Sequence, residues 1–185
     1  MMQHCKSRGF TLLDLLIALA ILSLLINLAT PNLTSSLEKS KSKSLTVNIR
    51  SAIALARTKA ITTEQTVSIC GLQNNNECTK NQFTQIAIFV DKNKNGRIDE
   101  AENVLLLNDL QYTGQITLGA SLGRKYIRFK KDGSAQQAGS FTYCNPNHPT
   151  YSSRVTISMM GRLYTAKDLD NDGIVENSDG SPISC

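Results

Sequence analysis

The hydrophobic pattern of the chain changes near residue 30 and again near residue 66. Between residues 12 and 29 the chain is nearly all Leu, Ile and Ala, interrupted by Asp14, Ser23 and Asn27. A helix that spans a bilayer needs about 20 mostly apolar residues. The pattern therefore predicts a transmembrane helix over residues 10–30.

Beyond Pro31, apolar residues recur at helical spacing with Lys and Ser between them. They are Leu33, Leu37, Leu45, Ile49, Ile53, Ala56 and Ala60. This spacing predicts an amphipathic helix over residues 31–62 whose apolar stripe packs on another part of the chain. The lysines within it, Lys39, Lys41 and Lys43, favour a solvated face, with a nucleic-acid or membrane patch as the alternative.

From Thr66 onward, short apolar or alternating segments are separated by Gly, Asn and Asp. Such a pattern is typical of an antiparallel sheet or small sandwich. The predicted strands are TVSIC, QIAIFV, NVLLL, QITLG, KYIRF, SFTYC and RVTISM. The fold class expected is α+β, a long N-terminal helix followed by a β-domain over residues 63–185.

Charge and the N-terminal flank predict how the chain is oriented. The formal net charge is +5, and Lys6 and Arg8 precede the apolar run, so that 5 − 2 leaves +3 beyond them. This modest excess does not by itself imply a polyanionic partner. By the positive-inside rule, the two N-terminal charges place this end in the cytoplasm and send the remainder outward.

Cysteine positions indicate an oxidising compartment. Four cysteines follow the apolar run, which fits two disulfides in an exported domain. Proximity along the chain favours Cys70 with Cys78 and Cys144 with Cys185, although four cysteines permit three pairings. A zinc site is the rival, but the chain has no CxxC pair and His148 is the one histidine of this part.

The acid Asp14 is unexpected in a membrane helix. A carboxylate costs roughly 2.5–3.5 kcal/mol at the bilayer centre and usually marks a paired charge. One interpretation places Asp14 at headgroup depth, as a favourable charge in the first turn of the helix. The other is that it pairs with a cation of another subunit.

The stretch KSRGFTLLDLL resembles the processing motif of type IV pilins and type II secretion pseudopilins. The resemblance implies cleavage after Gly9 by a prepilin peptidase, N-methylation of Phe10 and removal of a leader, residues 1–9. It also implies that Asp14, where the family normally has Glu, pairs with the new amine of a neighbouring subunit. Pro31 falls where pilins bend their long helix.

The second half resembles minor pilins of the FimT/FimU type and H-type minor pseudopilins. The stretches that carry this resemblance are IAIFVDKNKNGRIDEAENVLLL, YIRFKKDGSAQQAGSFTYC and SRVTISMMGRLY. It implies a protein held in the inner membrane, with the β-domain in the periplasm, and then incorporated into a pilus at the cell surface. The expected partners are other pilin subunits, the prepilin peptidase and methyltransferase, and the inner membrane.

Two acidic loops match the ligand spacing of a calcium loop. The first contains Asp91, Asn93, Asn95, Gly96, Asp99 and Glu102. The second contains Asp168, Asp170, Asp172, Gly173, Glu176 and Asp179, with Pro182 and Cys185 to constrain it. Asx-rich hairpin turns need no metal, and the first loop joins two predicted strands, so a cofactor-free protein is the alternative.

DNA is the second possible partner. The resemblance associates DNA uptake with a Gly-Arg-x-Arg motif, which this chain matches in part through Gly161, Arg162 and Tyr164. Additional phosphate contacts could come from other basic residues, with Tyr164 stacking on a base. These basic residues are Arg124, Lys125, Arg128, Lys130, Lys131 and Arg154.

Catalysis has little support in the sequence, since it has no GxSxG motif, no phosphate loop and no constellation around His148. The leading hypothesis is a structural minor pilin at or near the pilus tip. The alternatives are a DNA-binding pilin for natural transformation and a minor pseudopilin of type II protein secretion.

Overall fold

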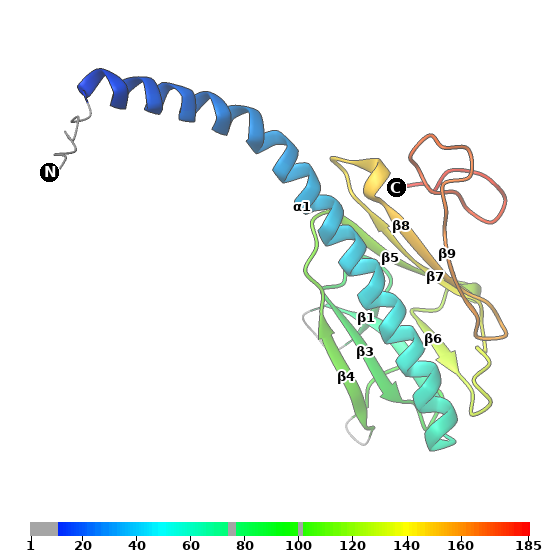
Figure 1. Ribbon diagram of the computed structural model, residues 1–185. Coiled ribbons are helices and arrows are strands. Elements are labelled where there is room, and N and C mark those ends of the chain that lie inside the picture. Colours follow the sequence, from blue (N-terminus) through cyan, green and yellow to red (C-terminus); the bar gives the residue numbers. More distant parts are fainter. Residues whose placement is uncertain (1–10, 74–76, 100–101) are drawn as a thin grey trace, which may run out of the picture. The chain divides into compact units, whose positions relative to one another are not determined.

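The computed structural model describes residues 11–73, 77–99 and 102–185, without the side chains of residues 26–33. The chain divides into two compact units, Met1–Lys39 and Ser40–Cys185. One helix, α1 (Leu12–Thr63), contributes to both units (Figure 1). The pattern predicts separate helices meeting at Pro31, whereas the structure has a single helix through that position.

The described part of the chain has no helix that is both long and apolar enough to cross a membrane. The predicted spanning segment, residues 10–30, lies partly outside the residues that are described with their side chains.

The second unit contains two antiparallel sheets (Figure 1). In its described residues the first sheet runs β2-β1-β3-β4, with β6 also paired to β1, and the second runs β5-β7-β8-β9. The strands are β1 (Val67–Leu72), β2 (Cys78–Thr79), β3 (Gln85–Val90), β4 (Val104–Asp109), β5 (Gln115–Ala120), β6 (Tyr126–Phe129), β7 (Gly139–Cys144), β8 (Ser153–Ile157) and β9 (Leu163–Thr165). All seven predicted strands are therefore present.

The strands β2 and β9 were not predicted. They have two and three residues, too few for alternation between apolar and polar positions to stand out. Two short 3-10 turns, η1 (Ser121–Gly123) and η2 (Pro149–Tyr151), complete the described elements.

The second half of α1 supplies one wall of the core. Most of the predicted stripe is buried, and Leu45, Ile49 and Ile53 are at most 2% exposed. These side chains belong to one apolar cluster with residues of both sheets, such as Ile88 and Phe141. Leu37, also predicted on this stripe, is instead 51% exposed, so the buried stripe begins near Leu45.

Strand β1 is buried on both faces, which explains why Ser68 is its only polar side chain. Val67 and Ile69 belong to the main core, whereas Cys70 and Leu72 belong to a second cluster that includes Phe89. A strand covered on both faces gains from apolar residues at every position. The second cluster supports the loop that follows β3.

Candidate functional site

The start of α1 is closed by reciprocal hydrogen bonds between Thr11 and Asp14. The amide and hydroxyl of Thr11 donate to Asp14 Oδ2 at 3.1 and 2.9 Å, and the amide of Asp14 donates to Thr11 Oγ1 at 3.3 Å. This is the capping-box arrangement, in which the first and fourth residues satisfy each other's exposed amides. Thr11 therefore caps the helix, and the carboxylate of Asp14 is held in its first turn.

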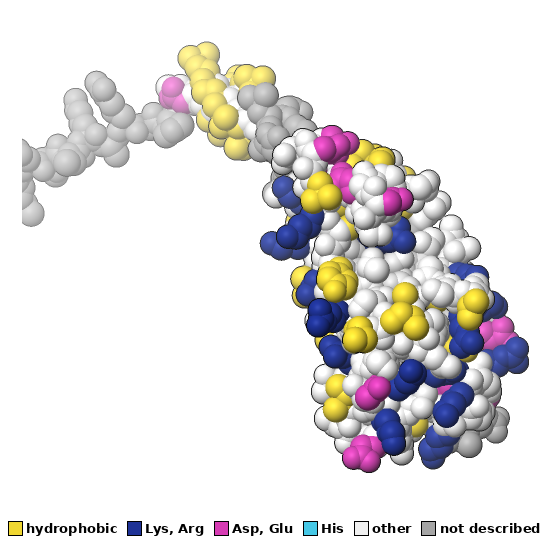
Figure 2. All heavy atoms as spheres, turned by 90° about the vertical axis from the view of Figure 1, so that its right-hand side faces the viewer, with side chains coloured by type: hydrophobic (Ala, Val, Ile, Leu, Met, Phe, Trp, Pro, Cys, Tyr) yellow, Lys and Arg dark blue, Asp and Glu magenta, His cyan; other side chains and the backbone are white. Residues whose placement is uncertain are grey.

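Exposed apolar side chains lie on either side of Asp14 along the helix. In residues 12–25 the large apolar side chains are 51–76% exposed. Figure 2 shows part of this surface in yellow. These side chains are Leu12, Leu13, Leu15, Leu16, Ile17, Leu19, Ile21, Leu22, Leu24 and Leu25.

The predicted processing site lies outside the described residues. Gly9 and Phe10 are not described, and neither is the side chain of Pro31. Cleavage, methylation and the bend at Pro31 therefore remain predictions.

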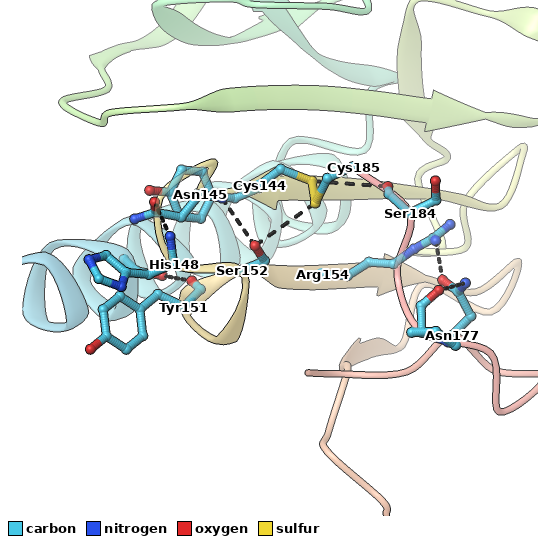
Figure 3. Close-up of a disulfide and its surroundings, with 12 residues drawn as sticks. Cys144, Asn145, His148, Tyr151, Ser152, Arg154, Asn177, Ser184 and Cys185 are labelled. Carbon is cyan, nitrogen blue, oxygen red and sulfur yellow. Dashed lines mark hydrogen bonds between the residues drawn. A yellow bond between two sulfur atoms is a disulfide. The ribbon is translucent and has the colours of Figure 1, made fainter. Parts of the chain in front are cut away.

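Two disulfides hold the β-domain together. Cys70 pairs with Cys78 and Cys144 with Cys185, the two pairings that proximity favours. The second tethers the C-terminus to the end of β7, beside Ser152 (Figure 3). Because these four sulfurs are bonded in two pairs, none of them is a thiolate that could bind the zinc ion of the rival prediction.

The first acidic loop is held by contacts within the protein. Asp91 is fully buried and accepts hydrogen bonds from Arg128 at 2.8 and 2.9 Å and from Ser68 Oγ at 2.6 Å. The side-chain amides of Asn93 and Asn95 both donate to Asp99 Oδ2. The ion pair corrects the prediction that Arg128 contacts phosphate, because its guanidinium is only 3% exposed.

The second acidic loop brings four predicted ligands together. Asp168, Asp170, Asp172 and Glu176 offer carboxylate oxygens that all lie within 4.8 Å of one another. Asp179, predicted as the closing ligand, is not part of this group. Its Oδ1 instead accepts hydrogen bonds from the amide and hydroxyl of Ser181, which lower the pKa of Asp179.

Part of the predicted DNA-contacting set lies on two packed turns. A Cβ added to Gly161 would lie 2.2 Å from the carbonyl oxygen of Gly133, and Ala135 N donates to Met159 O at 2.9 Å. The turn before Arg162 therefore packs against the turn that carries Lys130 and Lys131. Figure 2 shows many basic side chains in the lower half of this face, with acidic ones among them.

The remaining predicted DNA residues lie elsewhere. Arg124 and Lys125 line a cleft of about 410 Å³ that also contains Asp99. Tyr164, which is 53% exposed, lines a different cleft with Arg154. Arg154 itself donates to Asn177 and to Ser140.

His148 lies in a loop beside Tyr151, with ring centroids 5.0 Å apart (Figure 3). This contact places the ring against another aromatic side chain of the loop.

Sequence reasoning missed three partners at these sites. Thr11 caps the helix, Ser68 completes the Asp91 cluster, and Arg57 Nε donates to Gly133 O at 3.0 Å. The Thr-x-x-Asp spacing could have identified Thr11. The other two depend on contacts between segments far apart in the sequence.

Two family models match this chain. Residues 46–161 match the family model described as type II transport protein GspH, and residues 4–26 match the prokaryotic N-terminal methylation motif. No curated protein matches the chain significantly.

Two crystal structures of the type IV minor pilin FimU from Pseudomonas aeruginosa are similar to this chain at 17% identity. In the first, the match covers 82% of this chain and 97% of FimU, with a TM-score of 0.48. In the second it covers 69% and 91%, with a TM-score of 0.45. Because the GspH model matches more than half of its length, the chain belongs to the GspH family of pilin-like proteins and carries an N-terminal methylation motif.

Proposed function

We propose that this protein is a minor subunit of a type IV pilus. Its N-terminal helix lies in the inner membrane before assembly and in the helical core of the filament afterwards. The observation that carries the proposal is the exposed apolar surface of residues 12–25, which contains a single carboxylate, Asp14.

This apolar surface extends around the whole helix. Successive residues are about 100° apart, so Leu12, Leu13, Leu15 and Leu16 point in different directions. A helix that is apolar on all sides is buried in a bilayer or in a protein core. Burial of one such side chain gains about 1.5–3 kcal/mol, so ten of them outweigh one carboxylate at about 2.5–3.5 kcal/mol.

Asp14 supplies the register of assembly in this proposal. Cleavage after Gly9 would give every copy a positively charged amine at Phe10. The Asp14 carboxylate of one subunit would then form an ion pair with the Phe10 amine of a neighbouring subunit. The bond between Phe10 and Thr11 survives the cut, so the Thr11 amide that caps Asp14 is still present. The carboxylate is therefore already oriented before the neighbour arrives.

Substitution of Asp14 tests this function in cells. Asp14→Asn and Asp14→Ala should leave leader cleavage and membrane insertion intact but reduce incorporation into sheared filaments at least tenfold. Asp14→Glu should assemble as the parent does. Asp132→Asn, at an exposed turn of the β-domain, is the matched control. If Asp14→Ala entered filaments at the parent's level, the pairing would be rejected.

A gene deletion separates a pilus from a secretion pseudopilus. Deletion of the gene should abolish surface pili if the chain serves a pilus, and should abolish export of folded proteins if it serves type II secretion. The resemblance to minor pilins further favours a position at the tip. Labelling of an epitope on the β-domain should then appear at filament ends.

A second candidate function, DNA capture, is favoured by the two packed turns. Lys130, Lys131 and Arg162 come from adjacent turns, with Arg57 beside them. Grouped cations of this kind contact phosphates by charge alone, which makes binding strongly dependent on salt.

Salt-titrated DNA binding by the full chain in detergent tests this candidate. Each lost phosphate contact should reduce the slope of log K against log salt by about 1. Arg162→Ala and Lys131→Gln should each do so, while Lys92→Gln, at an exposed lysine of another loop, should not. If the parent and the three variants had equal slopes of log K against log salt, DNA contact at these turns would be excluded.

A further inference from the structure

The loop between β9 and the C-terminal disulfide gathers four carboxylates on one short segment. Asp168, Asp170, Asp172 and Glu176 each offer an oxygen, and these oxygens lie within 4.8 Å of one another. Like charges at this distance repel, and the repulsion is relieved by a cation or by donors nearby. The number of carboxylate oxygens that accept no hydrogen bond from the loop therefore determines whether the cluster can bind a cation.

Backbone amides account for only part of the carboxylate oxygens. Asp168 accepts from the amides of Asn171 and Gly173 at 2.7 and 2.9 Å, through Oδ1 and Oδ2. Asp170 and Asp172 each accept one backbone amide through Oδ1. Their Oδ2 atoms accept no hydrogen bond from a described residue, and so remain available to a ligand.

Glu176 provides an independent indication of a ligand. The residue is only 6% exposed, and its Oε2 accepts from the amide of Leu169 at 2.6 Å. Its Oε1 is buried and has no hydrogen-bond partner among the described residues. An unsatisfied buried carboxylate oxygen is costly unless something positive approaches it. The carboxylate that contains this oxygen is part of the four-residue cluster.

Contacts within the fold hold the loop closed around these groups. The amide of Glu176 donates to Lys167 O at 3.0 Å, which joins the two ends of the loop, and Glu176 also forms a β-bridge with Pro182. Arg154 of β8 donates to Asn177, directly after Glu176 (Figure 3). The ligands are therefore on a segment that is already fixed to the second sheet.

Gly173 permits the sharp turn that this arrangement requires. It lies at the sixth position counted from Asp168 and has a φ of +89°, in the region that favours glycine. Calcium loops use a glycine at that position for the same reason. A β-carbon there would also lie 3.0 Å from Thr150 Cγ2.

We propose that this loop binds one Ca²⁺ through Asp168, Asp170, Asp172 and Glu176. Carboxylate oxygens are the ligands of hard cations, and Ca²⁺ accepts six to eight of them in flexible geometry, whereas Mg²⁺ requires a near-ideal octahedron. The backbone carbonyl of Ile174, at the seventh position, is the expected fifth ligand. Glu176 at the ninth position supplies the carboxylate that Asp179 does not.

The first acidic loop is a useful contrast within the same chain. There, Asp91 is neutralised by Arg128. Glu102 Oε2 also lacks a hydrogen-bond partner among the described residues, but the carboxylates of this loop do not gather around it as those of the second loop do around Glu176. A guanidinium already occupies the position of the charge partner. The proposal therefore concerns the second loop alone.

Calcium binding should fix the segment from Lys167 to the disulfide at Cys185. The test uses the purified full chain in detergent micelles, stripped of metal and titrated with CaCl₂ by calorimetry. We expect one ion per chain, with a dissociation constant of about 10⁻⁴ M, as in extracellular calcium modules. MgCl₂ should bind at least tenfold more weakly. Trypsin cleavage at exposed Lys167 should slow at least fivefold with Ca²⁺ relative to EDTA.

Variants assign this binding to the loop. Glu176→Gln keeps the shape of the side chain and should weaken binding at least tenfold, and the double variant Asp170→Asn/Asp172→Asn should abolish it. Asp132→Asn, another aspartate in an Asx-type turn, is the matched control and should bind as the parent does. Asp99→Asn, in the first loop, should also leave binding unchanged.

Three results would overturn the proposal. The first is a parent protein that binds no Ca²⁺ at 1 mM, an about tenfold excess over the expected constant. The second is Glu176→Gln or the double variant binding as tightly as the parent. The third is loss of binding in Asp99→Asn with retention in Glu176→Gln. The parent titration and its trypsin assay need no variant, so they test the proposal even if a variant fails to fold.

Discussion

Arg128 and Asp91 form a buried ion pair between β6 and the loop that follows β3. The Nε and one terminal nitrogen of Arg128 donate to the same oxygen, Asp91 Oδ2, at 2.9 and 2.8 Å. Their exposed fractions are 3% and 0%, and Ser68 Oγ donates to that oxygen at 2.6 Å. The amide of Gly96 also points to the carboxylate, which is therefore fully enclosed by donors.

Arg128→Ala should destabilise the β-domain by about 3–5 kcal/mol, because it leaves Asp91 buried without a compensating charge. Removal of both charges in Arg128→Met/Asp91→Leu should cost less than the single change, since no uncompensated charge remains. Urea unfolding of the full chain in detergent measures both. Arg97→Ala, at an exposed arginine of the same loop, is the control. A single variant no less stable than the double variant would contradict this account.

The ion pair also shows what the sequence could not reveal. The stretch beginning at Asp91 matches a calcium-loop spacing, and Arg128 lies in a basic segment, so each was assigned a different ligand. The strand register brings Arg128 and Asp91 together instead. Strand β1 pairs with both β3 and β6, and Arg128 lies opposite Ser68. Local patterns carry no information about a partner 37 residues away.

Elements defined by local periodicity could be predicted. The strands β1, β3 and β7 follow from apolar runs and alternation, and the buried stripe of α1 from its helical spacing. The gathering of Asp168 to Glu176 also followed from local spacing, because one loop contains every ligand. By contrast, the contact between the Gly133 and Gly161 turns depends on how the sheets and α1 pack.

Glu102 should make stability depend on pH. Burial and the nearby charge of Asp91 raise the pKa of Glu102. A raised pKa means that the folded state binds the proton more tightly than the unfolded chain, so ionisation of Glu102 opposes folding as the pH rises. Glu102→Gln should therefore be more stable than the parent at pH 7, by about 0.5 kcal/mol or less.

The advantage of Glu102→Gln should shrink as the pH falls and vanish below about pH 4, where the parent's carboxyl is neutral too. Urea unfolding at a series of pH values measures the difference. Glu64→Gln, at an exposed carboxylate, serves as the control and should show no such trend. A constant difference across the series would show that hydrogen bonding, and not ionisation, causes the effect.

The two disulfides should differ in their contribution to stability. Cys144–Cys185 closes a loop with a sequence separation of 41, against 8 for Cys70–Cys78. The chain-entropy model assigns about 4 kcal/mol to the longer loop and about 2.5 kcal/mol to the shorter. Unfolding of Cys144→Ser/Cys185→Ser and of Cys70→Ser/Cys78→Ser measures both losses. Because Cys70 is fully buried in an apolar cluster, a larger loss for the shorter loop would indicate that packing outweighs chain entropy.

Gly161→Ala should destabilise the protein through two separate effects. Gly161 has a φ of +72°, where a β-carbon costs roughly 1–2 kcal/mol. That carbon would also lie 2.2 Å from Gly133 O, a backbone atom that cannot rotate away. The turns must then separate, and we expect a total loss of about 2–4 kcal/mol in urea unfolding. Gly180→Ala is the matched control, because Gly180 has a φ of +79° with nothing within 4 Å of the added carbon. Gly180→Ala should lose only the roughly 1–2 kcal/mol that a β-carbon costs at positive φ. Equal losses of unfolding free energy in the two variants would show that the contact between the turns adds nothing to stability.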